Sequence, residues 1–291
     1  MNDTCQNFNL REEDSGEYSI EIDPRATDNQ TIKQLRELGF NRISLGVQDF
    51  DPAVQKSVNR IQSEAQTFAV LEAARKEGFR STSIDLIYGL PLQTVTSFSV
   101  TLDKILSVDP DRFSIFNYAH LPTRFKTQRQ MNEADMPSAE VKLNILQMII
   151  QRLLEAGYIY IGMDHFAKPD DELAIAQRDN KLYRNFQGYS THSDCDLIGL
   201  GITSIGRVAD RCIQNVKDLA AYDAAIKLGA LPVFKGLVLN DDDKLRCAVI
   251  TQLICHFSLS FEQIEQQYAI QFRDYFSDEL TVYIACKKML Y

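Results

Sequence analysis

The stretch ARKEGFRSTSIDLIYGLP, residues 74–91, contains a helix end, a glycine turn and an apolar strand in immediate succession. Gly78 follows the last helical turn, where glycine readily takes the left-handed conformation, and Phe79 begins the strand. The same order occurs at Gly39 in LRELGFNRISLGVQ and at Gly157 in LLEAGYIYIGMDHFA, close to one and two repeat lengths away. A repeat of this kind indicates successive βα units.

The predicted strands have nearly continuous apolar centres, as parallel strands covered on both faces require. They are expected at residues 18–23, 42–48, 81–88, 112–118 and 158–163. A (β/α) barrel needs more strands than these, so the chain is either an open sheet or a fragment. We predict an α/β fold with parallel strands, either an open sheet or a partial (β/α) barrel.

The pattern changes to helices in the last third of the chain. Helices are predicted at residues 216–228, 242–255, 261–269 and 272–280. The predicted domains are a polar lead at 1–17, the partial barrel at 18–207 and an incomplete helical C-terminal domain at 208–291.

The charge balance argues against a nucleic-acid or anionic-membrane surface. The chain has 31 lysines and arginines against 40 aspartates and glutamates, and no long block of like charges. It contains no apolar run of membrane-spanning length, and its first residues lack the layout of a signal peptide. We therefore expect a cytoplasmic protein with no nucleic-acid and no membrane partner.

The six cysteines stand far apart and form no C-x-x-C pair, which suits neither a zinc ribbon nor a cluster-binding loop. We interpret them as free thiols in a reducing compartment.

The run GMDHFAKPDDELAIAQ, residues 162–177, resembles a set of metal ligands because it holds four carboxylates and a histidine. The alternative is a helix start, in which a proline is followed by acidic residues that complement the helix dipole. We favour the helix start and predict no metal site here.

Polar side chains occur near the carboxyl ends of the predicted strands, where parallel βα folds place their sites. They include Glu21, Asp23, Gln48, Asp85, Tyr88, Asn117, Tyr118, His120, Asp164 and His165. Bonds to neighbouring backbone explain any one of them, but five strands together favour a polar ligand with hydroxyl and amine donors. Arg60 adds a guanidinium group, whose planar set of donors suits a carboxylate. The glycines of GLGITSIG, residues 199–206, lack the spacing of a phosphate loop and are interpreted as close packing.

Several of these motifs together resemble one family. They are YSIEIDPR, RISLGVQDF, VNRIQ, SIDLIYGLP, NYAHLPT, GMDHFAKPDDELAIAQ and RNFQGYSTHSDCDLIGLGITSI. In order and in register, from about residue 15 to about residue 280, they resemble the oxygen-independent coproporphyrinogen III oxidases, radical S-adenosylmethionine enzymes of haem biosynthesis. Related tetrapyrrole chaperones share SLGVQ and DLIYGLP but lack the MDHFAKPDDELA and RNFQGY block.

The resemblance implies a cofactor, a substrate and a reaction. The family oxidatively decarboxylates two propionates of coproporphyrinogen III to vinyl groups, giving protoporphyrinogen IX, with an external electron donor and acceptor. The positions similar to ligands of a first S-adenosylmethionine are Glu21 and Ile205. Those similar to ligands of a second are Gln48, Arg60, Asp85 and Ala119.

The four carboxylates of coproporphyrinogen require a local basic patch on an acidic protein. TRFKTQRQ supplies Arg124, Lys126 and Arg129, and AQRDNKLYRNFQGY supplies Arg178, Lys181 and Arg184. We expect Arg124, Arg184 and Gln187 to contact the substrate; the alternative is a pair of solvated basic loops.

The resemblance also implies a radical-SAM (β/α) barrel, of which this chain would be a partial one that lacks its first strands. It implies a [4Fe-4S] cluster held by a C-x-x-x-C-x-x-C loop. That loop, the first strand and the glycine-rich loop after the second strand would precede Met1. The end of the C-terminal domain would be absent or altered after about Leu280. We therefore expect this chain to be catalytically silent by itself and to be a monomer. The alternatives are a tetrapyrrole-binding or haem-chaperone-like protein without catalysis, and an ordinary barrel lyase or aldolase.

Overall fold

The computed structural model describes residues 2–10, 14–193 and 195–289. The chain forms two compact units, residues 1–175 and residues 176–291. None of the described helices combines the length and the apolar character needed to cross a membrane.

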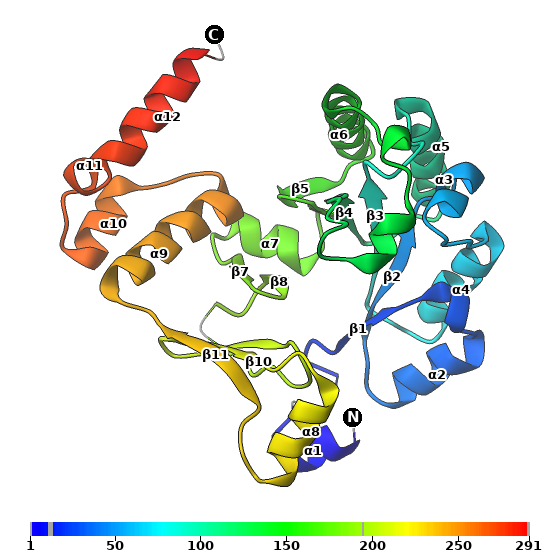
Figure 1. Cartoon of the computed structure of the whole chain (residues 1–291), viewed down its shortest axis with the longest axis horizontal. Coiled ribbons are helices and arrows are strands. Elements are labelled where there is room, and N and C mark those ends of the chain that lie inside the picture. The colour runs from blue at the N-terminus through cyan, green and yellow to red at the C-terminus, as the bar shows by residue number, and fades with distance from the viewer. Residues whose placement is uncertain (1, 11–13, 194, 290–291) are drawn as a thin grey trace. The chain divides into compact units, whose positions relative to one another are not determined.

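The first unit is built on a six-stranded sheet with the order β1-β2-β3-β4-β6-β5 (Figure 1). Its strands are β1 (Ser19–Ile22), β2 (Arg42–Gln48), β3 (Ser81–Tyr88), β4 (Arg112–Asn117), β5 (Ile159–Gly162) and β6 (His165–Ala167). The pairs β1–β2, β2–β3 and β3–β4 are all parallel, so their carboxyl ends share one edge of the sheet. The predicted α/β fold with parallel strands is confirmed.

Helices connect these strands as the repeat predicts. They are α2 (Asn29–Glu37), α3 (Pro52–Ser57), α4 (Glu64–Lys76), α5 (Val95–Leu106) and α6 (Ala139–Glu155), with α1 (Asn2–Asn7) before the sheet and α7 (Glu172–Arg178) after it. Short 3-10 turns are η1 (Pro24–Ala26), η2 (Lys126–Gln130) and η3 (Glu133–Asp135). The predicted polar lead thus includes the helix α1.

The three repeated glycines end their helices in the predicted left-handed conformation. The φ angles of Gly39, Gly78 and Gly157 are 98°, 79° and 89°. At Gly78 the following amide, that of Phe79, donates to the carbonyl of Ala74 at 3.0 Å, which satisfies an orphan carbonyl of the last turn. Where the sequence has Asp-Pro instead of glycine, Asp109 takes the same region with φ 48°.

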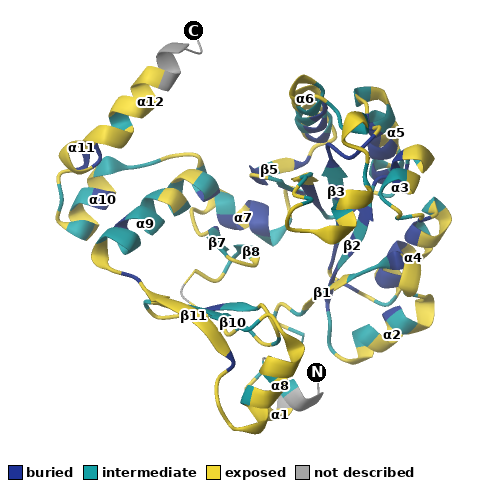
Figure 2. Ribbon diagram, viewed as in Figure 1, coloured by how far each residue is buried: buried dark blue, intermediate teal, exposed yellow. Residues whose placement is uncertain are grey.

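One face of the sheet is covered by helices and forms the core. The core residues of the strands include Ile43, Leu45, Ile84, Leu86 and Phe113, each at most 2% exposed. Figure 2 shows buried residues gathered on β2 and β3 and on parts of α4, α5 and α6. Because side chains alternate along a strand, the other face carries the intervening polar residues.

The strand predicted at residues 158–163 is present as β5 and runs in the same direction as β4, but a strand that was not predicted, β6, lies between the two. β5 lies at the edge and pairs only with β6, and both β5–β6 and β6–β4 are antiparallel. Gly162 and Met163 have φ angles of 137° and 47°, so the chain reverses in a tight hairpin between β5 and β6. The returning strand β6 then takes the place beside β4.

The second unit contains strands as well as helices. β7 (Tyr183–Asn185) and β8 (Gly188–Ser190) form a hairpin, and β9 (Ile205–Val208), β10 (Arg211–Asn215) and β11 (Val233–Val238) form an antiparallel sheet. Its helices are α8 (Leu219–Lys227), α9 (Asp241–His256), α10 (Phe261–Tyr268), α11 (Phe272–Tyr275) and α12 (Ser277–Met289). The sequence predicted helices alone after residue 208, whereas β10 and β11 also lie there. The units meet at residues 175 and 176, and the proposed domain boundary at 207 and 208 stays a prediction.

Candidate functional site

The open face of the sheet in the first unit is polar at its centre. On β2 and β3 the side chains between the core residues are Ser44, Ser83 and Asp85, all partly exposed, and Gly46 lies among them. The strand register places Glu21 of β1 opposite Ser44. This arrangement gathers oxygen-bearing side chains from three neighbouring strands on one surface.

Asp85 is the central group of this surface. Ser44 Oγ donates to Asp85 Oδ1 at 2.9 Å, and the Ser114 side chain also hydrogen-bonds to the carboxyl group. Burial raises the pKa of Asp85 to about 6; the two hydroxyl groups oppose that rise, and the nearby charge of Glu21 adds to it. A carboxyl group that titrates this close to neutrality is typical of a ligand-binding or catalytic position.

Arg60 lies beside the end of β2, in the loop after α3. Its Nη2 donates to the carbonyl of Gly46 at 2.7 Å, and its Nη1 lies 3.5 Å from Asp23 Oδ2. Its Nε is buried and has no hydrogen-bond partner among the described residues. Burial lowers the pKa of the guanidinium, and the Asp23 charge opposes that change. The guanidinium as a whole is partly exposed, so it places a positive charge at this edge of the sheet that can attract an anionic group.

The end of β2 is shaped around Arg60. Gln48 has a φ of 71°, and the register with β3 shifts between Gly46 and Gln48. A Cβ atom on Gly46 would lie 3.1 Å from both Arg60 Nη2 and Gln48 Nε2. Hydrogen bonds from Arg25, together with the charge of Arg60, lower the pKa of Asp23 to about 2.

Ala119 follows β4 at the same edge of the sheet, in a loop whose residues hydrogen-bond to one another. Its carbonyl accepts a hydrogen bond from Gln128 Nε2 at 3.1 Å, which leaves one lone pair of the oxygen for a ligand. Tyr118 Oη donates to Met131 Sδ at 2.9 Å and lies 3.3 Å from His120 Nδ1. The structure thus places Glu21, Gln48, Arg60, Asp85 and Ala119 at the carboxyl half of one parallel sheet.

Of the other predicted site residues, three belong to the second unit and one to the first. Ile205 begins β9, where a Cβ on Gly199 would lie 2.9 Å from the Ile205 carbonyl oxygen. This close approach confirms the predicted packing role for Gly199, and a Cβ on Gly206 would lie 2.8 Å from the Leu197 carbonyl oxygen, whereas Gly201 has open space around it and a φ of 93°. Arg184 lies on β7 with its guanidinium carbon 4.8 Å from the centre of the Tyr189 ring, and Gln187 is exposed at the β7–β8 turn. Arg124 is exposed in the first unit, in the loop after β4.

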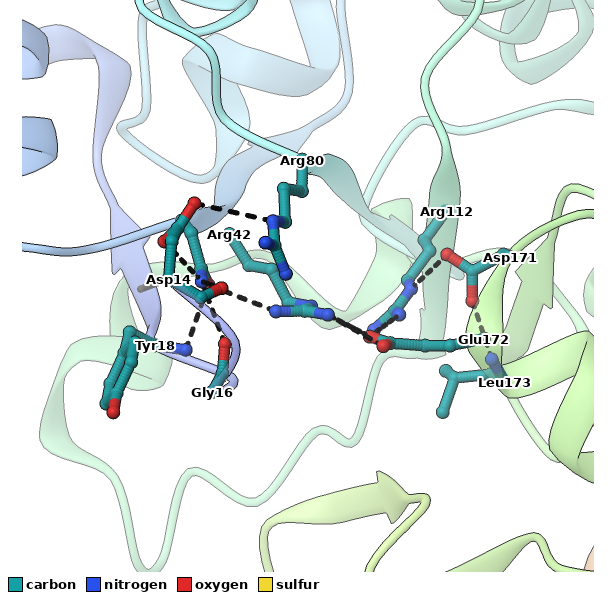
Figure 3. A network of polar contacts seen from close by, with 10 residues as sticks. Asp14, Gly16, Tyr18, Arg42, Arg80, Arg112, Asp171, Glu172 and Leu173 are labelled. Atoms are coloured by element: carbon teal, nitrogen blue, oxygen red, sulfur yellow. Dashed lines mark hydrogen bonds and ion pairs between the residues drawn. The ribbon is translucent and has the colours of Figure 1, made fainter. Parts of the chain in front are cut away.

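The acidic run at residues 170–172 binds arginines. Asp171 Oδ1 accepts the amide of Leu173 at 2.8 Å, so the predicted role at a helix start is confirmed for this residue. Figure 3 shows Arg42 and Arg112 both directed at Glu172, with N–O distances of 2.6 and 2.8 Å. Arg112 also contacts Asp171 at 2.7 Å. These arginines were not predicted as partners of the acidic run; they lie at the starts of β2 and β4, away from the edge that holds Asp85.

No group of three potential metal ligands occurs among the residues that the structure describes. Cys195, Cys212, Cys247 and Cys255 are free thiols, and burial raises the pKa of Cys255 to about 11. The side chains of Cys5 and Cys286 lie outside the described part. The cysteines that are described do not fit the trio of thiolates that an iron–sulfur cluster needs.

Comparison with known proteins decides the family. The radical SAM superfamily model matches residues 7–105. An oxygen-independent coproporphyrinogen III oxidase from Thermostichus vulcanus is 49% identical over 265 residues, which cover 91% of this chain and 82% of that protein. The chain belongs to the oxygen-independent coproporphyrinogen III oxidase family.

Other members of the oxygen-independent coproporphyrinogen III oxidase family are longer than this chain. The enzyme from Pseudomonas aeruginosa is 54% identical over 278 residues, which cover 96% of this chain and 60% of that protein. The solved structure of the Escherichia coli coproporphyrinogen III oxidase, described as a radical SAM enzyme, matches with a TM-score of 0.91 and 49% identity. That match covers 95% of this chain and 64% of the other. The chain thus spans about 60% of the length of the first of these relatives.

The structure adds two residues to the site that the sequence did not reveal, and it gives a partner to a third. Ser44 and Ser114 bond to Asp85, and Asp23 contacts Arg60. Asp23 was noted only as a strand-end acid. In the sequence each serine shows only as a hydroxyl residue inside an apolar strand, and the register that brings both beside Asp85 appears only in the structure.

Proposed function

We propose that the polar face of the first unit binds S-adenosylmethionine. The observation that carries this proposal is the placement of the Asp85 carboxyl group and the Arg60 guanidinium at one edge of a sheet within the radical SAM match. Asp85 and Glu21 accept hydrogen bonds from ribose hydroxyl groups or from the ammonium group of the methionine moiety. Arg60 binds the methionine carboxylate as a charged donor.

The remaining ligands follow from the family resemblance. Glu21 and Ile205 contact a first S-adenosylmethionine, and Gln48, Arg60, Asp85 and Ala119 contact a second. Ala119 contributes the free lone pair of its carbonyl, and Ile205 contributes backbone and apolar contact.

The site is tested by titrating the chain with S-adenosylmethionine in a calorimeter. Glu21→Gln and Asp85→Asn should each weaken binding about tenfold or more, because each removes a charged acceptor. Glu72→Gln is the matched control, since Glu72 is exposed on α4. Equal affinities for the two site variants and the control would refute the site.

We further propose that the protein takes part in the oxidative decarboxylation of coproporphyrinogen III to protoporphyrinogen IX. When bound, S-adenosylmethionine with a reduced [4Fe-4S] cluster supplies a 5′-deoxyadenosyl radical. A propionate side chain loses a hydrogen atom, the bond to its carboxylate breaks to release carbon dioxide, and one electron passes to an external acceptor. The residues of this chain bind and orient the reactants and shape the electrostatics around them.

Arg124, Arg184 and Gln187 are the proposed contacts to the porphyrinogen carboxylates. Charge reversal of Arg124 and of Arg184 in an enzyme that includes these residues and the cluster should weaken porphyrinogen binding and leave S-adenosylmethionine affinity unchanged. Unchanged porphyrinogen affinity would remove both arginines from the substrate site.

We also propose that these 291 residues, assayed alone, do not cleave S-adenosylmethionine. The support is the wide spacing of the six cysteines, none of which forms a C-x-x-x-C-x-x-C loop. The chain is incubated anaerobically with iron, sulfide, dithionite and S-adenosylmethionine, and 5′-deoxyadenosine is measured. Production above a cluster-free control would contradict the proposal. A cytoplasmic location, a monomeric state and an external electron donor complete the proposal.

A further inference from the structure

The carboxyl group of Asp85 is held from both sides by hydroxyl groups of the neighbouring strands. Ser44 on β2 donates to Asp85 Oδ1 at 2.9 Å, and Ser114 on β4 bonds to the same carboxyl group. The register sets Ser114 directly opposite Asp85, while Gly46 is the β2 partner of Asp85 and Ser44 precedes it by two residues on the same face.

This arrangement restricts the direction of the carboxyl group. A carboxylate has about four acceptor positions, and the two serines occupy positions on its two sides along the sheet. The Gly46 position beside Asp85 on β2 lies next to Gln48 Nε2 and Arg60 Nη2, each 3.1 Å from where a Cβ of residue 46 would be. The two serines leave about two acceptor positions of the carboxyl group for a donor that approaches the open face.

We propose that Ser44 and Ser114 are positioning residues that hold the Asp85 carboxylate in the orientation in which it accepts a hydrogen bond from S-adenosylmethionine. This inference rests on the proposed function, because it assumes that the ligand binds at Asp85. The serines act through the carboxylate and need not touch the ligand.

The same two bonds also favour the ionised form of Asp85. Burial raises the pKa of this carboxyl group, and the bonds from Ser44 and Ser114 lower it toward its ordinary range. The only other charged group acting on Asp85 in the described part of the chain is Glu21 on β1, which raises the pKa. Removing either hydroxyl should therefore raise the pKa of Asp85 above its value in the unaltered chain.

The first measurement follows the carboxyl carbon of Asp85 by NMR during a pH titration of the ligand-free chain. Ser44→Ala and Ser114→Ala should each move the midpoint to higher pH. Ser44→Thr, which keeps a hydroxyl group, should restore the midpoint. Ser107→Ala is the matched control, because Ser107 lies at the end of α5, where its Oγ donates to the carbonyl of Lys104 at 2.7 Å and not to Asp85.

The second measurement is S-adenosylmethionine affinity at a fixed pH near 6.5. Ser44→Ala and Ser114→Ala should each weaken binding by roughly three- to tenfold in the unaltered background, the range expected for one hydrogen bond. In an Asp85→Asn background the same substitutions should have no further effect, because the group that they position has been changed.

The outcomes separate this inference from the proposed function. If Asp85→Asn leaves the affinity unchanged, the proposed binding site fails. If Asp85→Asn weakens binding but the serine variants keep both the affinity and the NMR midpoint of the unaltered chain, the site stands and the positioning role is refuted. If the serine variants weaken binding equally in both backgrounds, they act independently of Asp85, and the positioning role is again refuted.

Discussion

Asp85→Asn should stabilise the fold at neutral pH, although it weakens the proposed ligand binding. The pKa of Asp85 rises from 3.8 to about 6 on folding, because the carboxyl group is partly buried beside Glu21. An acid with a raised pKa is preferentially protonated in the folded state, so its ionisation opposes folding as the pH rises through this interval. A rise of roughly two pH units corresponds to about 3 kcal/mol at pH 7.

The pH dependence distinguishes this effect from a general change in packing. At pH 4 the carboxyl group is protonated in the folded state and only partly ionised in the unfolded state, so the stabilisation should shrink to about 0.5 kcal/mol there and should be nearly complete above pH 7. Urea denaturation of both proteins between pH 4 and pH 8 measures the difference in the free energy of unfolding. An Asp85→Asn variant that is less stable than the unaltered chain at pH 7, or equally stabilised at every pH, would refute the reasoning.

Two further pairs of substitutions, each with its own control, test a buried ion-pair network and a close approach of two backbone segments. Arg112→Met should lower the free energy of unfolding by about 3 kcal/mol, because it leaves the nearly buried Asp171 carboxylate without its partner. Lys33→Met removes one side of an exposed ion pair and should change the free energy of unfolding little. Urea titration measures both. Equal effects of the two would show that the Arg112 network adds no stability. Gly206→Ala should cost about 1–3 kcal/mol, because its Cβ would lie 2.8 Å from the Leu197 carbonyl oxygen. Gly236→Ala, with contacts of 3.4 Å or more, should be tolerated, and a thermal melt that ranks the two glycines the other way would contradict the packing argument.

The repeated units were predictable because local signals define them. The glycine after each helix and the apolar strand that follows determine both boundaries, and β2 and β3 span the predicted residues 42–48 and 81–88. The antiparallel β6 was not predicted, because its position beside β4 depends on a two-residue reversal at Met163. With only three residues, β6 is too short to show the alternation of apolar and polar side chains that predicts a strand.

The sequence predicted which polar residues lie at the strand ends, but it did not predict which residues hydrogen-bond to them. Polar residues such as Asp85 and Arg60 stand out against apolar strands or beside them. Ser44 and Ser114 are ordinary strand residues until the register shows that they bond to Asp85. The two arginines that bind the acidic run are far from it in sequence, with Arg42 and Glu172 130 residues apart, so no local pattern reveals the pair.

The most direct test of the central claim, that the carboxyl edge of this sheet binds S-adenosylmethionine, compares that ligand with its decarboxylated analogue. The analogue keeps the sulfonium, ribose and adenine but lacks the carboxylate proposed to bind Arg60. Calorimetric titration of the unaltered chain should give about tenfold or greater preference for S-adenosylmethionine. Arg60→Met should abolish that preference by weakening S-adenosylmethionine binding alone. An Arg60→Met chain that retains the full preference would contradict the claim.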